Sequence, residues 1–244
     1  MDQVKKNISI NANGYNIDLI TNGVDNFNKI ILCFHGFNGD KWGGPFGGLK
    51  ERLKTSLVCS FDSCGHGDSE VTPEKMRLSD ILEEIKVVVD YLKKTFHKPI
   101  VLVANSYGAY RVMWYLIKFK PSIEQVVFVN PAFRILKILE TIRGFEYVNL
   151  NSNEMVLMKG DSNKFLNKKF LDDLNECDLY KNFYDIDYDI KIVVGIRDSL
   201  IPVEDTLEIA GKYNFEITYI DEEHRFENKE NWNVIADMIS EFKE

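Results

Sequence analysis

The sequence has few of the features that mark secreted, membrane-embedded or nucleic-acid-binding proteins. No stretch approaches the roughly 20 consecutive apolar residues that a membrane-spanning helix needs, and no apolar segment of signal-peptide length follows the polar residues 1–7. The net charge is −8, from 30 basic and 38 acidic residues, whereas a nucleic-acid surface needs clustered Lys and Arg. These absences predict a cytoplasmic protein with neither a membrane nor a nucleic acid as its partner.

Cysteine and histidine are also scarce, with four of each. The cysteines show no spacing typical of a disulfide framework, so we expect reduced thiols at Cys33, Cys59, Cys64 and Cys177. Cys64, His66 and Asp68 share one turn, but their spacing fits no zinc pattern. The sequence therefore predicts neither a metal nor a cofactor.

What the sequence does contain is apolar residues in a regular arrangement. Hydrophobic residues make up 45% of the 244 positions, enough for the core of one α/β domain. Alternating residues around Asn13 and Gly14 predict an N-terminal hairpin. Apolar runs predict buried strands at 29–34, 56–61, 100–104, 125–129, 190–194 and 215–220. Helical spacing predicts helices at 78–96, 107–119, 203–212 and 232–242. This alternation is typical of a parallel sheet with helices on both faces.

Residues 132–188 break the alternation. Apolar side chains recur at helical spacing in two sets, and no buried strand is indicated between them. Strands on both sides belong to one sheet, so we expect a small helical cap inserted into a single domain, 1–244, and placed over the strand ends. Its bulky aromatic residues are predicted to influence substrate choice: Phe145, Tyr147, Phe165 and Phe170.

A serine stands on the sharp turn between a buried strand and a helix. Ser106 follows the apolar run 100–104, and small residues, Ala104 and Gly108, flank it at two positions' distance. Asp198 and His224 follow later strands. Because ligands bind at the carboxyl ends of parallel strands, these three side chains are expected to converge on one edge of the sheet.

This pattern resembles the α/β-hydrolase family, whose nucleophile elbow reads G-x-S-x-G and whose triad follows the chain order Ser, Asp, His. Ala104 replaces the first glycine. The segments 195–202 and 62–69 are similar to the family's G-x-x-D-x-x-x-P and D-x-x-G-H-G-x-S turns. The resemblance implies the α/β-hydrolase fold, with a mostly parallel sheet of about eight strands flanked by helices.

The resemblance also implies roles. Ser106 would be the nucleophile, His224 the general base and Asp198 the acid that orients it. The backbone N–H groups of Phe37 and Tyr107 would form the oxyanion hole.

Four further residues have other expected roles. His35, followed by Gly36, resembles the family's His-Gly loop beside the oxyanion site. His66 is expected to be structural and His97 to lie on the surface. Asn130 stands where some members carry the acid, but an amide cannot hold the charge.

We therefore expect a serine hydrolase that cleaves a small-molecule carboxylic ester, with aromatic or medium-chain acyl groups as candidates. A narrower resemblance, to bacterial cinnamoyl or feruloyl esterases, is carried by residues 35–39, the small insertion, and residues 170–174 and 178–180. An acyl thioesterase with the same triad and a non-catalytic binding protein of the same fold remain alternatives. The sequence does not indicate the natural substrate or the oligomeric state.

Overall fold

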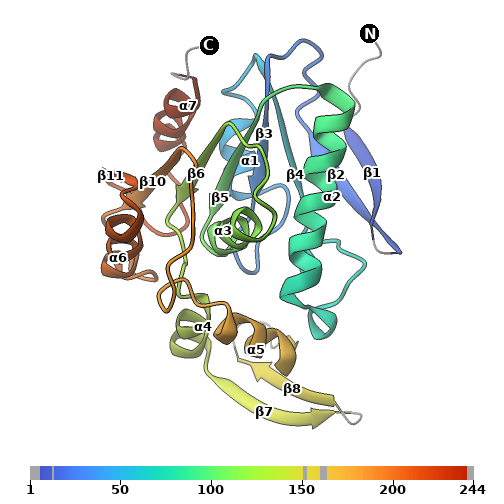
Figure 1. Ribbon diagram of the computed structural model, residues 1–244, viewed down its shortest axis with the longest axis vertical. Coiled ribbons are helices and arrows are strands. Elements are labelled where there is room, and N and C mark those ends of the chain that lie inside the picture. Colours follow the sequence, from blue (N-terminus) through green and yellow to red (C-terminus); the bar gives the residue numbers. More distant parts are fainter. Residues whose placement is uncertain (1–5, 13, 151–152, 160–163, 241–244) are drawn as a thin grey trace.

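A mixed sheet of eight strands forms the centre of the molecule (Figure 1). The computed structural model describes residues 6–12, 14–150, 153–159 and 164–240, so the predictions for residues 1–5, Asn13 and 241–242 lie outside the described residues. The strand order is β1-β2-β4-β3-β5-β6-β10-β11. The parallel strands are β3 (Lys29–Phe34), β4 (Ser56–Phe61), β5 (Ile100–Asn105), β6 (Gln125–Val129), β10 (Ile190–Gly195) and β11 (Glu216–Ile220). The hairpin β1 (Asn7–Ala12) and β2 (Tyr15–Thr21) adds an antiparallel edge, and the predicted mostly parallel sheet is confirmed.

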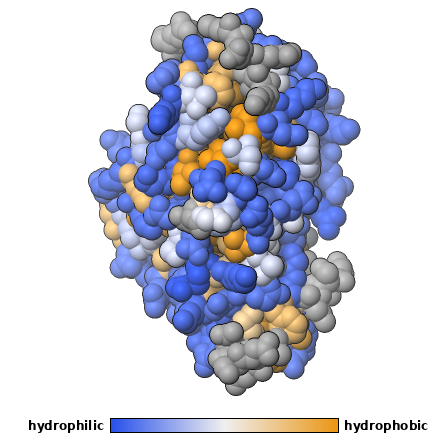
Figure 2. Space-filling view, turned by 90° about the vertical axis from the view of Figure 1, so that its right-hand side faces the viewer, coloured by the Kyte–Doolittle hydropathy of each residue, from blue (hydrophilic) through white to orange (hydrophobic). Residues whose placement is uncertain are grey.

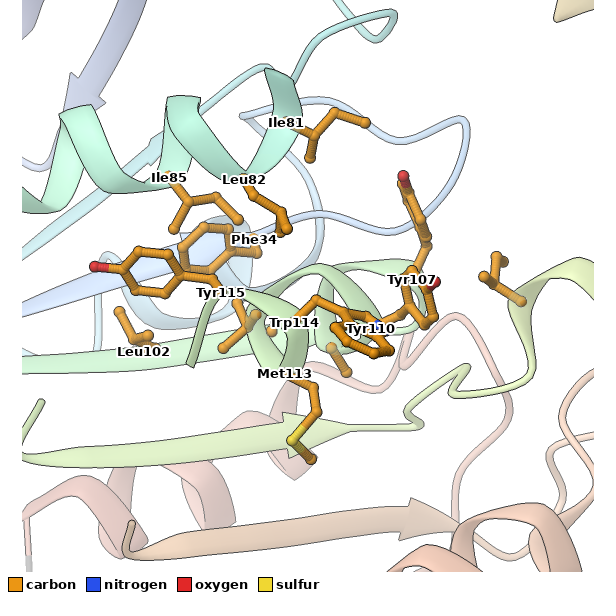
Figure 3. Packing of buried hydrophobic residues seen from close by; sticks show 14 of the residues in the cluster. Phe34, Ile81, Leu82, Ile85, Leu102, Tyr107, Tyr110, Met113, Trp114 and Tyr115 are labelled. Atoms are coloured by element: carbon orange, nitrogen blue, oxygen red, sulfur yellow. The ribbon is translucent and has the colours of Figure 1, made fainter. Parts of the chain in front are cut away.

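Helices cover both faces of this sheet because alternate strand residues point to opposite sides. In β3, Ile30 and Leu32 belong to the core cluster on one face and Ile31 to the cluster on the other. The first face is covered by α2 (Leu78–Phe96), α3 (Tyr107–Phe119) and α6 (Val203–Tyr213), and the second by α1 (Gly44–Leu49) and α7 (Trp232–Ser240). Figure 3 shows side chains of α2 and α3 packed together with residues of β3 and β5, including Phe34 and Leu102.

The outer surface on the side of α2 and β1 is mostly hydrophilic, with apolar residues gathered in a band across its upper half (Figure 2). Among the described residues, no helix combines the length and the apolar character that crossing a bilayer requires.

The segment between β6 and β10 is not all helical, and in this respect the sequence prediction is wrong. It holds α4 (Ile135–Arg143) at the first predicted set of apolar residues and α5 (Lys168–Glu176) at part of the second, whose Phe165 and Leu166 lie in a strand instead. The segment also contains a three-stranded antiparallel sheet. Its strands are β7 (Phe145–Leu150), β8 (Asn153–Met158) and β9 (Lys164–Asn167). These strands are short, and the apolar side chains Phe145 and Leu157 are only partly buried. The longest apolar run among them, 155–158 in β8, has only four residues, too few to distinguish a buried strand from part of a helix.

Polar contacts attach this segment to the main sheet and its helices. The Arg77 guanidinium, at the start of α2, donates two hydrogen bonds of 2.9 Å to the Asp173 carboxylate of α5. The same carboxylate accepts from the Leu78 N–H at 3.1 Å, and so caps α2. From α3, the Tyr110 hydroxyl donates to the Cys177 carbonyl at 2.7 Å. The short 3₁₀ turn Pro73–Lys75 lies beside β9. The segment is thus held against α2 and α3.

Candidate active site

Ser106 occupies a strained turn between β5 and α3. Its φ is +53°, a left-handed value that non-glycine residues rarely adopt. The Ser106 N–H donates to the Val129 carbonyl of the neighbouring strand at 3.0 Å, which fixes the turn against β6. A Cβ atom at Gly108 would lie 2.8 Å from the Phe34 carbonyl oxygen and 2.9 Å from that of His35. Position 108 therefore has room only for glycine, as the small-residue pattern around the serine predicts.

The structure brings the three predicted side chains together. The Ser106 Oγ lies 3.0 Å from His224 Nε2, and His224 Nδ1 lies 2.7 Å from the Asp198 Oδ2. The Asp198 Oδ1 accepts hydrogen bonds from the backbone N–H groups of Leu200 and Ile201, at 2.8 and 3.0 Å. Because the carboxylate can only accept, Nδ1 carries the proton and Nε2 is free to accept the hydroxyl hydrogen of Ser106. This tautomer suits a general base.

Two buried polar residues hold the loop that carries His224, and the sequence analysis missed both roles. The Asn130 amide donates to the carbonyls of Glu223 and His224 at 3.0 and 3.2 Å and accepts from the Gly195 N–H at 2.7 Å. Glu222 accepts from the Glu223 and Asn228 N–H groups and from the side chain of Asn231. Burial would raise the pKa of Glu222, but these hydrogen bonds hold it below its usual value. Asn130 thus ties the loop that carries His224 to β6 and β10.

The two predicted oxyanion donors are on segments next to the serine, since Tyr107 directly follows Ser106 and Phe37 follows Gly36. Neither the Phe37 nor the Tyr107 N–H has a hydrogen-bond partner among the described residues. Gly36 lies against the nucleophile, since a Cβ there would be 3.1 Å from Ser106 Cβ. The rings of Phe37 and Tyr107 pack edge to face with centroids 5.4 Å apart, so their side chains also link the two donor segments.

The other histidines lie outside the Ser106–His224–Asp198 chain. His35 and His66 are buried behind the Phe37 loop. Burial, aided by the Arg111 charge, keeps the pKa of His35 well below its usual value and lowers that of His66 to about 3. Both rings are therefore neutral. His97 is an exposed residue that ends α2 in a left-handed conformation.

The turn 62–69 is held by a buried ion pair. The Asp62 carboxylate accepts from both the backbone N–H and the Nζ of Lys41, each at 2.7 Å. It also accepts from the Asp68 N–H at 2.9 Å. Asp62 is thus occupied in shaping its own turn. Among the residues that the structure describes, no cluster of three or more His, Cys, Asp or Glu side chains is arranged to hold a metal ion.

A pocket of about 390 Å³ opens beside Ser106 and His224. Five aliphatic residues form its apolar wall, three from α4 and two from the loop after Asp198: Ile135, Ile138, Leu139, Leu200 and Ile201. The remainder of the lining comes from residues 35–40, Gly43, Gly44, Asn105, Ser106, His224 and Arg225. The aromatic residues that the sequence analysis singled out do not line this pocket. Phe170 is fully buried in the core, and Tyr147 is 63% exposed.

Comparison with known proteins bears on the fold. The family description "alpha/beta hydrolase fold" matches residues 29–146. No curated protein matches the sequence.

Three solved structures are similar over nearly the whole chain. Est1E from Butyrivibrio proteoclasticus, with ferulic acid bound, has a TM-score of 0.81 at 20% identity, covering 96% of this chain and 97% of its own. Alpha/beta hydrolase domain-containing protein 10 from mouse has a TM-score of 0.73 at 14% identity, covering 98% and 100%. An esterase from Pyrococcus furiosus has a TM-score of 0.68 at 18% identity, covering 98% and 90%.

Proposed function

We propose that this protein, an α/β-hydrolase by its fold, is an esterase that hydrolyses carboxylic esters through an acyl-enzyme on Ser106. The observation that carries the proposal is the continuous hydrogen-bonded chain Ser106–His224–Asp198 at the base of a partly apolar pocket. A serine that only caps a helix has no need of a histidine aligned on its hydroxyl by a buried carboxylate.

Each residue has a defined part in the proposed reaction. Ser106 Oγ attacks the ester carbonyl carbon while His224 Nε2 takes the hydroxyl proton, and Asp198 stabilises the resulting imidazolium. The carbonyl oxygen becomes an oxyanion that accepts hydrogen bonds from the Phe37 and Tyr107 N–H groups. Collapse of this intermediate breaks the bond to the alcohol, which leaves with the proton from His224. Water, deprotonated by His224, then releases the acid and restores Ser106.

The pocket wall favours apolar acyl groups. Its aliphatic side chains can cover a medium-length chain or one face of an aromatic ring, and its volume lies in the range of small-molecule sites. That Est1E holds ferulic acid supports testing hydroxycinnamate esters first. Thioesters would use the same chemistry, so acyl-CoA substrates belong in the same screen.

The test combines covalent labelling with substitution. A fluorophosphonate probe should modify Ser106, and a screen of p-nitrophenyl esters, methyl hydroxycinnamates and acyl-CoAs should identify the substrate class. Ser106→Ala, His224→Ala and Asp198→Asn should each lower kcat by about 10³-fold or more while the circular dichroism spectrum is unchanged. Near-wild-type ester hydrolysis by Ser106→Ala would contradict the assignment. A wild-type protein that binds esters without turning them over would favour the non-catalytic alternative.

A further inference from the structure

We propose that Arg111 is a positioning residue that fixes the geometry of the oxyanion hole. The inference rests on the proposed function, because it assigns Arg111 a part in the same reaction. Arg111 lies on α3, five residues after Ser106, and is 1% exposed. It does not line the pocket, so it would act only through the residues that it contacts.

Arg111 contacts both segments that carry the proposed oxyanion donors. Its Nη2 donates a hydrogen bond of 2.6 Å to the His35 carbonyl, two residues before Phe37. Its guanidinium carbon lies 4.9 Å from the centre of the Tyr107 ring, a cation–π contact. Tyr107 projects from the beginning of α3, where Figure 3 shows its ring near that of Tyr110. One cation therefore bridges the loop before the first donor and the residue that carries the second.

The Phe37 N–H belongs to the peptide unit that follows the one whose carbonyl Arg111 holds. His35 Nε2 accepts from the Ser63 N–H at 3.2 Å, so the proton of the neutral ring is on Nδ1, which donates to the Gly36 carbonyl at 2.8 Å. The Gly39 N–H donates to the same carbonyl at 3.1 Å. In a trans peptide the C=O and the following N–H point in opposite directions, so fixing the Gly36 oxygen aims the Phe37 N–H away from it. Arg111 holds the preceding carbonyl and completes the restraint.

A purely structural role does not explain an arginine at this position. Its Nε and Nη1 atoms are buried and have no hydrogen-bond partner among the described residues. Burying a guanidinium with two unpaired nitrogen atoms lowers the free energy of unfolding. Well-packed apolar residues often replace buried charges with no loss of stability. The nearby Glu84 carboxylate offsets part of the charge. The cost is explained if the bond to the His35 carbonyl serves catalysis rather than folding.

Arg111→Met tests this because methionine fills a similar volume without donating a hydrogen bond. The control is Tyr110→Phe, one position earlier on α3, which removes a hydrogen bond to the Cys177 carbonyl but keeps the ring that stacks on Tyr107 and does not line the pocket. With p-nitrophenyl acetate, Arg111→Met should lower kcat at least tenfold and leave KM within about twofold, since an oxyanion exists only in the transition state. Its affinity for a boronic acid transition-state analogue should fall in parallel. Tyr110→Phe should stay within about twofold in both measurements.

If the wild-type protein is labelled at Ser106 and hydrolyses ester, three results would overturn the inference. They are an Arg111→Met kcat close to wild type, a loss confined to KM, and an equal loss in Tyr110→Phe. If Arg111→Met does not fold, Arg111→Lys is the second test. The lysine side chain is shorter and keeps the charge, but it cannot match the hydrogen bond to the His35 carbonyl, so kcat should fall while KM is unchanged. A wild-type kcat in Arg111→Lys would refute the positioning role. A wild-type protein that neither labels nor hydrolyses any ester instead refutes the proposed function, and the inference falls with it.

Discussion

At the residue scale, the site residues that the sequence predicts are those that follow a strand, because their position along the chain determines where they lie in the fold. Ser106, Asp198 and His224 each follow a buried strand, and the ends of parallel strands meet at one edge. Arg111 and Asn130 could not be found in this way. Arg111 occupies an apolar helix face where the pattern predicts core, and Asn130 follows a strand, but only the packing of β6 against β10 shows which carbonyls its amide reaches.

Glu84 makes stability depend on pH in a predictable direction. It is fully buried on α2 and accepts hydrogen bonds from Tyr15, Ser63 and the Cys64 N–H. Burial outweighs these bonds and raises the pKa of Glu84 to about 7 from an ordinary 4.5. Between these values the folded protein holds a proton that the unfolded chain has released. The contribution of Glu84 to the free energy of unfolding should therefore fall as pH rises, by about 3 kcal/mol over this range. The buried neutral rings of His35 and His66, whose pKa values are lowered, contribute in the opposite sense below about pH 6.5.

Urea unfolding at pH 5 and pH 7 measures this effect. Glu84→Gln, which resembles the protonated carboxyl, removes the Glu84 contribution and leaves that of the two histidines. Its free energy of unfolding at pH 7 relative to pH 5 should therefore be higher than that of the wild type by about 2 kcal/mol. The matched control is Glu83→Gln, the neighbouring residue, whose side chain is 41% exposed and pairs loosely with Lys118 at 3.6 Å. It should retain the wild-type difference. If Glu84→Gln shows the same change in free energy of unfolding between pH 5 and pH 7 as the wild type, Glu84 does not hold a proton in the folded protein.

At the element scale, the buried strands and long helices follow from the sequence, whereas the segment between β6 and β10 follows only in part. A continuous apolar run identifies a strand covered on both faces, such as β5 or β6. The strands β7, β8 and β9 belong to a small sheet, and β7 carries the exposed Tyr147. Their longest apolar run, 155–158, has four residues, which the sequence pattern cannot distinguish from part of a helix. The helices α4 and α5 each bury one apolar stripe, and their periodicity is therefore visible.

We expect α4 to determine acyl preference, because it supplies three of the aliphatic side chains of the pocket wall. Ile138→Phe should narrow the pocket, lowering kcat/KM for octanoate esters about tenfold while acetate esters stay within about threefold. Rates across an acetate, butyrate, octanoate and ferulate series provide the measurement. The control is Tyr147→Ala, on β7 outside the pocket lining, which should leave the ranking unchanged. An unaltered ranking in Ile138→Phe would show that acyl groups bind elsewhere.

At the scale of the whole molecule, the site is assembled from distant parts of the chain. Ser106 and His224 are 118 positions apart, and they meet only when β11 is paired beside β10. The central strands alone do not complete the site. The order of strands in the sheet could be anticipated only through the family resemblance, because apolar runs identify strands but not their neighbours.

The position of β11 implies that the protein can lose activity without unfolding. It is the outermost strand, bonded on one side only and partly exposed, and edge elements of this kind open at lower free energy than the core. On heating, esterase activity should decline at a lower temperature than the far-ultraviolet circular dichroism signal.

Asn130 ties the loop after β11 to the inner strand β6, and so opposes this local opening. Asn130→Gly tolerates the positive φ at this position while removing the side-chain bonds, and should widen the gap between the two midpoints. Coincident midpoints in both proteins would mean that the edge strand and the core melt as one cooperative unit.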